Sequence, residues 1–219
     1  MKNFSNYREI LIRKTEIKPK YLWFNNFSSF LWQNRVFKNK TVLDFGCDIE
    51  SPACAQFMEQ NLSDKNYFGY DISETVTKWL KNKKYYYDFW NDNSKKFDVI
   101  NASEVYEHLS KELRENFLKR SYYLLKPGGK LYIDIPYIAN LNIIEFYRRD
   151  RTHEAVACED EALYIEQFGF ITQLFVGGYT IPYLSFFTNL YRIMTNLILG
   201  YKPFLVTFII ARKNVKKNN

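Results

Sequence analysis

Short apolar runs alternate with longer helical patterns from residue 41 to the end of the chain, and this alternation limits the possible folds. The predicted strands are 42–45, 67–70, 85–87, 97–101, 130–135, 170–176 and 204–211. The predicted helices are 52–62, 73–80, 111–125, 160–168 and 182–199. Strands that alternate with helices form a mostly parallel sheet with helices on both faces.

The length and composition indicate one α/β domain with additions. The chain has 219 residues, and its hydrophobic content of 47% is enough for a full core. It contains no run of about 18 or more uncharged apolar residues, so no transmembrane helix is predicted. The charged N-terminal residues are not expected to form a signal peptide. Three cysteines without a CxxC pair indicate a reduced, cytoplasmic protein.

The net charge of +7 is distributed unevenly along the chain. Residues 1–40 carry +7, residues 41–200 carry −5, and residues 201–219 carry +5. A mildly acidic central part argues against a nucleic-acid enzyme, in which basic residues usually line the active face. The basic ends are compatible with peripheral contact to an anionic membrane, with an anionic substrate, or with solvated ends that aid solubility.

Three segments carry the residues that bear most on function. They read T-V-L-D-F-G-C at 41–47, F-D-V-I-N-A-S-E-V-Y-E-H-L at 97–109 and L-L-K-P-G-G-K at 124–130. The first two end neighbouring strands, and the third closes a helix and opens the next strand. In this order and spacing they resemble the class I methyltransferases that use S-adenosylmethionine (SAM), in particular small methyltransferase-domain enzymes of the ubiquinone and sugar O-methyltransferase type.

The resemblance implies a fold and a cofactor. It implies a Rossmann-like sheet of seven strands with an antiparallel last strand, and SAM lying across the carboxyl ends of the first, second and fourth strands. Asp71 would accept hydrogen bonds from the ribose, and Asp88 would meet the adenine unless it is only a turn residue. The cofactor-binding residues implied are Asp44, Gly46, Cys47, Asp48, Asp71, Ile72, Asp88, Phe89, Asn101, Ala102, Ser103 and Glu104.

The loop after the first strand departs from the usual pattern. Asp48 and Glu50 stand where family members usually carry glycine, and their carboxylates could face the SAM ammonium or repel its carboxylate. A dinucleotide would require G-x-G-x-x-G, of which Gly46 is the one match among Gly46, Asp48 and Ser51. The pyrophosphate would also meet two carboxylates, so a dinucleotide is disfavoured.

The second segment contains a potential metal-binding pattern. Glu104, Glu107 and His108 repeat the E-x-x-E-H pattern that can hold a divalent metal in ubiquinone-type O-methyltransferases, and these side chains are chemically suitable ligands. Many relatives have the same letters without a metal, and His108 can equally be a structural residue at a helix start. No metal is expected.

His153 is the candidate catalytic residue. It lies in the segment between strand 130–135 and helix 160–168, which faces the acceptor in similar enzymes. Methyl transfer mainly requires that the two reactants are oriented, but an alcohol or phenol acceptor also needs a base near neutral pH. The alternative is a solvated loop histidine. Arg148, Arg149 and Arg151 could hold an anionic group of the acceptor or could be solvated.

The two ends of the chain suggest additions to the methyltransferase domain. Residues 1–40 are predicted to be an aromatic, helical N-terminal cap that packs on the sheet or covers the acceptor, and residues 41–219 form the methyltransferase domain. The segment 181–199 has a wide apolar face and a narrow polar stripe. It is expected to pack against the last strand or to form a homodimer surface rather than to lie in a membrane.

The acceptor is predicted to be a small molecule and not a nucleic acid, because no N-P-P-Y or D-P-P-Y segment follows the strand 97–101. The predicted reaction is O-methylation of a sugar or lipid-linked saccharide precursor. Two alternatives remain: a quinone-type O-methyltransferase at a membrane surface, and a non-catalytic scaffold, which the acidic loop residues Asp48 and Glu50 motivate.

Overall fold

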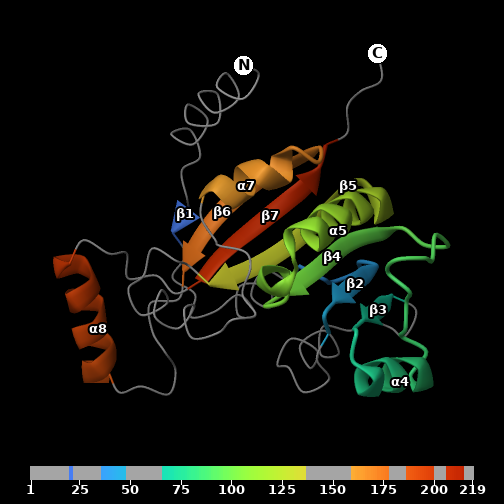
Figure 1. Cartoon of the computed structure of the whole chain (residues 1–219), viewed down its shortest axis with the longest axis horizontal. Coiled ribbons are helices and arrows are strands. Elements are labelled where there is room, and N and C mark those ends of the chain that lie inside the picture. The colour runs from blue at the N-terminus through green and yellow to red at the C-terminus, as the bar shows by residue number, and fades with distance from the viewer. Residues whose placement is uncertain are drawn as a thin grey trace, which may run out of the picture.

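The computed structural model describes residues 20–21, 36–47, 66–136, 159–177, 186–199 and 206–214, which form one seven-stranded sheet with helices around it (Figure 1). The strands are β1 (Lys20–Tyr21), β2 (Val42–Phe45), β3 (Tyr67–Tyr70), β4 (Phe97–Ser103), β5 (Leu125–Pro136), β6 (Phe170–Gly177) and β7 (Val206–Lys213). The helices are α4 (Glu74–Asn82), the 3-10 helix η1 (Tyr106–His108), α5 (Lys111–Leu124), α7 (Glu159–Glu166) and α8 (Phe186–Ile198).

The strands follow the order β1-β6-β7-β5-β4-β2-β3. The neighbouring strands β3, β2, β4 and β5 are parallel, whereas β7 runs antiparallel between β5 and β6. From β2 the chain adds β3 on one side and then returns to the other side of β2 with β4. The predicted fold class, a Rossmann-like sheet of seven strands with an antiparallel last strand, is confirmed.

Two apolar cores cover the two faces of the sheet, because successive side chains of a strand point to opposite faces. Leu43 belongs to the first core and Val42 to the second. Helices α5 and α7 cover the first core and contribute Phe117 and Ile165. Helix α4 covers part of the second core with Leu80.

The seven strands are not the seven that the sequence predicts. Residues 85–87 form only an isolated parallel bridge, between Gly69 and Tyr86. The chain then enters a turn in which the Asp92 amide donates a hydrogen bond to the Asp88 carbonyl, so the pairing with β3 does not continue. The seventh strand is β1, which pairs in parallel with β6 and comes from the segment expected to be helical. Apart from residues 20–21 and 36–40, the predicted cap lies outside the described residues, as does the predicted helix 52–62.

The glycines after α5 have a different role from the predicted one. Helix α5 ends at Leu124, and Gly128 and Gly129 lie inside β5 rather than ending the helix. The pairing of β4 with β5 shifts register between Phe97 and Val99. A Cβ atom on Gly129 would lie 3.0 Å from the Lys126 carbonyl oxygen and 3.2 Å from that of Asp98. The close approach of the backbones at this irregularity therefore favours glycine.

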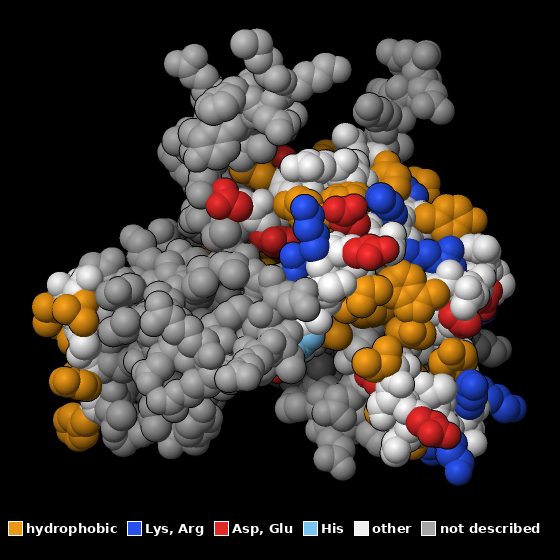
Figure 2. Space-filling view, viewed as in Figure 1, with side chains coloured by type: hydrophobic (Ala, Val, Ile, Leu, Met, Phe, Trp, Pro, Cys, Tyr) orange, Lys and Arg blue, Asp and Glu red, His pale blue; other side chains and the backbone are white. Residues whose placement is uncertain are grey.

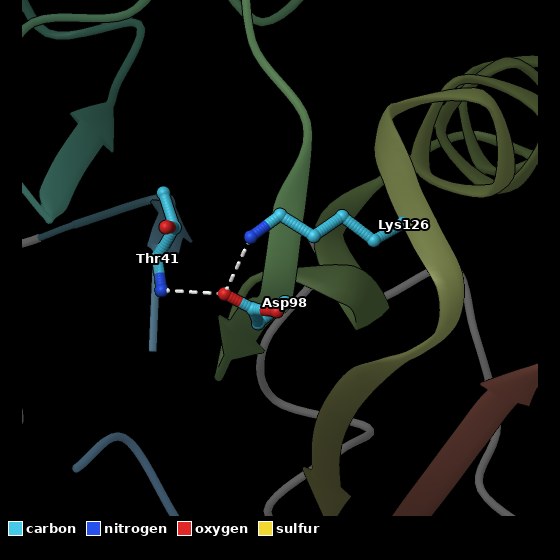
Figure 3. Close-up of polar contacts among 3 residues, drawn as sticks. All are labelled: Thr41, Asp98 and Lys126. Carbon is cyan, nitrogen blue, oxygen red and sulfur yellow. Dashed lines mark hydrogen bonds and ion pairs between the residues drawn. The ribbon is translucent and has the colours of Figure 1, made fainter. Parts of the chain in front are cut away.

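Asp98 connects three segments at the amino end of β4 (Figure 3). Its Oδ2 accepts hydrogen bonds from the Thr41 amide, at 2.9 Å, and from the Lys126 ammonium, at 2.8 Å. Burial raises the pKa of Asp98, but the Lys126 ammonium and the Thr41 amide together outweigh burial and hold this pKa below its usual value. The ionised carboxylate therefore ties the beginnings of β2 and β5 to β4.

We predict that Asp98→Asn lowers the free energy of unfolding by about 1 kcal/mol near neutral pH, because it removes one charge of a half-exposed pair. The pKa of Asp98 is lower in the folded than in the unfolded chain. The stabilisation by its carboxylate is therefore present above the unfolded-state pKa of about 3.9 and is lost as the pH falls through the folded-state pKa. Urea unfolding at about pH 7 and about pH 3 measures both effects. Lys119→Ala, which removes the exposed contact with Glu115 at 3.9 Å, is the control and should change little. An equal loss in both variants would contradict the role of Asp98.

Candidate active site

The carboxyl ends of β2, β3 and β4 meet at one edge of the sheet. Strand β2 pairs with β3 on one side and with β4 on the other, so Asp44 lies opposite both Gly69 and Asn101. The chain leaves β2 toward β3 and comes back to β4, which makes β2 the point where the strand order reverses. Ligands of open α/β sheets bind in the crevice outside such a point.

A buried polar group lies at the end of β2. Asp44 Oδ1 accepts a hydrogen bond from Asn101 Nδ2 at 2.8 Å, and Oδ2 accepts one from the Tyr67 hydroxyl at 3.3 Å. Burial is the main cause that raises the pKa of Asp44 to about 7, although both hydrogen bonds lower it. Asn101 Oδ1 is buried and has no hydrogen-bond partner in the described part of the chain. Such an acceptor fits a ligand that donates a hydrogen bond, as the SAM ammonium would.

Gly46 and Cys47 form the tight turn after β2. Gly46 has a φ of +74°, and its amide donates to the Tyr70 carbonyl at 2.8 Å. A Cβ atom at Gly46 would lie 2.6 Å from a methyl group of Val105, so any larger residue would be strained and would clash. The Cys47 side chain is buried beside Gly69, so it is the Cys47 backbone that lies along the turn.

Asp71 and Ile72 follow β3. Asp71 Oδ1 accepts a hydrogen bond from the Ser73 amide at 2.6 Å, which fixes the carboxylate in a turn before α4. Ser73 is the N-cap residue of α4 as predicted, but its side chain makes no capping hydrogen bond. The Ile72 side chain is 91% exposed. A fixed carboxylate beside an exposed apolar side chain can take a ribose and an adenine, respectively.

Asp88 and Phe89 lie in the turn that ends the pairing with β3. Asp88 Oδ1 accepts hydrogen bonds from the amides of Trp90 and Asn91. Asp88 is therefore a turn residue, which was one of its two predicted roles, and its contact with the adenine stays a prediction. The Phe89 ring is buried in the first core against Phe45 and Phe117. The side chain of Phe89 is therefore a core residue here, while its part in cofactor binding stays a prediction.

The segment after β4 is bound to the end of β5. Ala102 is buried, and Ser103 and Glu104 lie next to Asp134, whose Oδ1 accepts a hydrogen bond from the Glu104 amide at 3.1 Å. Glu104 has a positive φ of 52°, which bends the chain away from the strand. Asp134 was not predicted from the sequence, although a single acid in the apolar run L-Y-I-D-I was a possible signal.

Three carboxyl groups come together at this end of the sheet. Asp134 is buried, and burial is the main cause that raises its pKa well above the usual value; the charges of Glu104 and Glu107 raise it further. Glu107 is buried, whereas His108 on the same short helix is exposed. In the described ranges no three His, Cys, Asp or Glu side chains form a group that could hold a metal.

Tyr106 links this segment to α7. Its hydroxyl donates to Glu161 Oε1 at 2.6 Å. Burial is the largest cause that raises the pKa of both groups, so Glu161 holds a proton more readily than an exposed glutamate. No local sequence pattern indicates this contact, because the two residues are 55 positions apart.

Several predicted site residues lie outside the described residues. They are His153, Asp48, Glu50, Arg148, Arg149 and Arg151. Of the other predicted residues, the structure brings Asp44, Gly46 and Asn101 together at the β2 edge. The roles of Asp48 and His153 stay predictions.

The comparison with known families agrees with this geometry. Residues 19–163 match the family described as "Methyltransferase domain". The chain belongs to this family. It is an enzyme of the SAM-dependent methyltransferase class, and SAM is its cofactor. The matched range includes β2 to β5 and most of α7, and therefore all described strands that border the crevice.

Solved structures with the same fold include several methyltransferases. A SAM-dependent methyltransferase from Archaeoglobus fulgidus is 21% identical, with a TM-score of 0.62 over 85% of this chain and 92% of that one. A possible histamine N-methyltransferase from Thermotoga maritima is 15% identical, with a TM-score of 0.56 over 96% of both chains. The 1,6-didemethyltoxoflavin N1-methyltransferase from Burkholderia thailandensis, solved with S-adenosylhomocysteine, is 14% identical, with a TM-score of 0.54 over 86% and 77%. No curated protein matches the chain in sequence.

We predict that Asp71→Ala weakens binding of SAM and of S-adenosylhomocysteine by about tenfold or more, because two ribose hydroxyls lose a charged acceptor. Isothermal titration calorimetry measures both affinities. Asp92→Ala is the matched control, since Asp92 Oδ1 accepts from the Ser94 amide at 2.7 Å in an equivalent turn. An unchanged dissociation constant in Asp71→Ala would remove Asp71 from the ribose site.

We predict that Asp44→Asn removes a pH dependence of stability. The folded-state pKa of Asp44 is raised to about 7, so the folded chain keeps a proton that the unfolded chain releases above its lower pKa. Wild-type stability should therefore fall as the pH rises from about 4 through about 7, by on the order of 3 kcal/mol, relative to Asp44→Asn. Urea unfolding across this range measures the difference. Parallel curves for the two proteins would show that Asp44 does not titrate in this window.

Proposed function

We propose that the enzyme transfers the methyl group of SAM to a hydroxyl group of a small molecule, a sugar or a lipid-linked saccharide precursor. The observation that carries this proposal is the cluster of carboxyl groups formed by Asp134, Glu104 and Glu107 at the ends of β4 and β5. Burial and the charges of Glu104 and Glu107 raise the pKa of Asp134 and so favour its protonated form, which can both donate and accept a hydrogen bond with a hydroxyl group. The charges of Glu104 and Glu107 repel phosphate and carboxylate groups. They favour a neutral, hydroxylated acceptor at the point of transfer.

In the cofactor half of the site, Asp71 would hold the ribose and Ile72 would cover the adenine. Asn101 would receive the ammonium of the methionine part through its buried Oδ1, beside Asp44. Gly46 would let the β2 turn approach the cofactor closely. SAM supplies a methyl group on a sulfonium, which leaves readily, so the protein mainly orients the reactants and removes a proton from the acceptor.

His153 is proposed as the base that takes this proton. An unperturbed imidazole has a pKa near 6.5 and can accept a proton from a hydroxyl group near neutral pH. The arginines 148, 149 and 151 nearby in the sequence would bind a phosphate of a lipid-linked acceptor. The basic ends of the chain support peripheral contact with a membrane on its cytoplasmic side. A quinone-type acceptor at such a surface is the second candidate.

A panel of acceptors with methyl-labelled SAM tests the proposal. The panel contains a free sugar, a prenyl-linked saccharide, a quinol and a primary amine, and the product is analysed by mass spectrometry. We expect label on a saccharide oxygen. Label on the quinol alone would favour the second candidate. Label on the amine alone would overturn O-methylation, because carboxylates also attract a cation.

With the acceptor that the panel identifies, His153→Ala is expected to lower turnover by about a hundredfold or more, the usual contribution of a general base. The affinity for S-adenosylhomocysteine should stay nearly unchanged. Thr152→Ala, at the neighbouring position, is the control. Wild-type turnover in His153→Ala would exclude this residue as the base.

A further inference from the structure

The guanidinium of Arg120 binds the turn at residues 88–93, which we call the 88–93 turn. Arg120 lies in the last part of α5 and is half-buried. Its Nε donates to the Phe89 carbonyl at 2.6 Å, its Nη2 to the Asp92 carbonyl at 2.6 Å and its Nη1 to Asn93 Oδ1 at 2.7 Å. One planar side chain therefore binds both the beginning and the end of the turn.

The turn also has hydrogen bonds of its own. The Asp92 amide donates to the Asp88 carbonyl at 2.9 Å. Asp88 Oδ1 accepts from the amides of Trp90 and Asn91 at 3.1 and 3.2 Å. These bonds orient the Asp88 carboxylate relative to the turn, but they do not tie the turn to the rest of the molecule. The guanidinium of Arg120 ties it to α5.

The 88–93 turn begins at the carboxyl end of β3, where the crevice lies. The Tyr87 amide, just before the turn, donates to the carbonyl of Gly69 at 3.0 Å, one residue before the end of β3. Burial is the main cause that raises the pKa of Tyr70, and the charges of Asp88 and Asp71 raise it further. The carboxylates of Asp88 and Asp71 therefore both lie near the Tyr70 hydroxyl, at the same edge of the sheet.

We propose that Arg120 is a positioning residue for SAM: it holds the 88–93 turn so that the Asp88 carboxylate accepts a hydrogen bond from the amino group of the adenine. This role rests on the cofactor arrangement proposed above and on the predicted contact of Asp88 with the adenine. Asp88 Oδ2 accepts, among the described residues, only from the Asn91 side chain, at 3.1 Å. A carboxylate oxygen can accept a second hydrogen bond, so Oδ2 can bind the base.

Two ligands that differ at one position of the base test this role. They are S-adenosylhomocysteine and its analogue in which hydrogen replaces the amino group of the adenine. We expect wild type to bind S-adenosylhomocysteine more tightly, because a charged acceptor bonds the amino group. Arg120→Met should weaken this binding by about tenfold and change the affinity for the analogue by less than about twofold. Isothermal titration calorimetry measures both affinities.

Arg120→Met is expected to fold. The Phe89 ring stays in the first core, the Tyr87 hydroxyl still donates to the Asp92 carbonyl, and methionine has a high helix propensity. Arg120→Lys is the second variant. Its single ammonium cannot reach all three acceptors as the planar guanidinium does, so it should recover only part of the lost affinity.

A double variant tests whether Arg120 acts through Asp88. Asp88→Ala alone should weaken binding of S-adenosylhomocysteine. In that background Arg120→Met should change the affinity little further, because the carboxylate that Arg120 positions is gone. Non-additive losses are the expected sign of two residues that act as one unit.

Lys119→Met is the matched control. Lys119 is the neighbouring residue on α5, and its exposed ammonium lies 3.9 Å from Glu115. Figure 2 shows hydrophobic and charged side chains mixed on the face where α5 lies, so an exposed methionine is an ordinary surface residue there. Lys119→Met should bind both ligands as wild type does. Circular dichroism checks that all variants are folded.

Several outcomes would overturn this role. Arg120→Met could bind S-adenosylhomocysteine as tightly as wild type, or could lose the same factor for both ligands, as a general loosening of the fold would cause. The losses in the double variant could be additive. Wild type could bind both ligands equally, which would remove the contact of Asp88 with the amino group. Wild type that binds neither ligand would overturn the cofactor site as well. The assay contains no acceptor, so its result is independent of the proposed methylation reaction.

Discussion

The buried carboxyl group of Asp44 connects strands β2, β3 and β4, and the cofactor edge of the sheet depends on this connection. Asn101 on β4 and Tyr67 on β3 both donate hydrogen bonds to it. Removing a carboxyl group from water is costly, and burial here raises its pKa to about 7. The hydrogen bonds offset part of that cost. They also fix the side chain of Asn101, whose other polar atom, Oδ1, is buried and has no hydrogen-bond partner among the described residues.

Local sequence patterns were sufficient to predict where β2 to β7 lie along the chain. Short apolar runs separated by helices allow few arrangements, and the antiparallel last strand followed from the resemblance. The patterns failed where an element depends on a distant neighbour. Gly128 and Gly129 follow an amphipathic helix and therefore look like a helix end. Gly129 instead lies where the backbones of Lys126 and of Asp98, about thirty positions earlier, approach closely at the register shift between β4 and β5.

The site residues also differ in whether a local sequence pattern or a distant contact determines their place. Gly46 and Asp71 could be predicted because a tight turn and a strand-end carboxylate each have a local signature. Phe89 could not be placed, because only packing against Phe45 and Phe117 puts its ring into the core. Asp134 accepts a hydrogen bond from the Glu104 amide, 30 positions away in the sequence. Such contacts arise from the strand order, which no local pattern records.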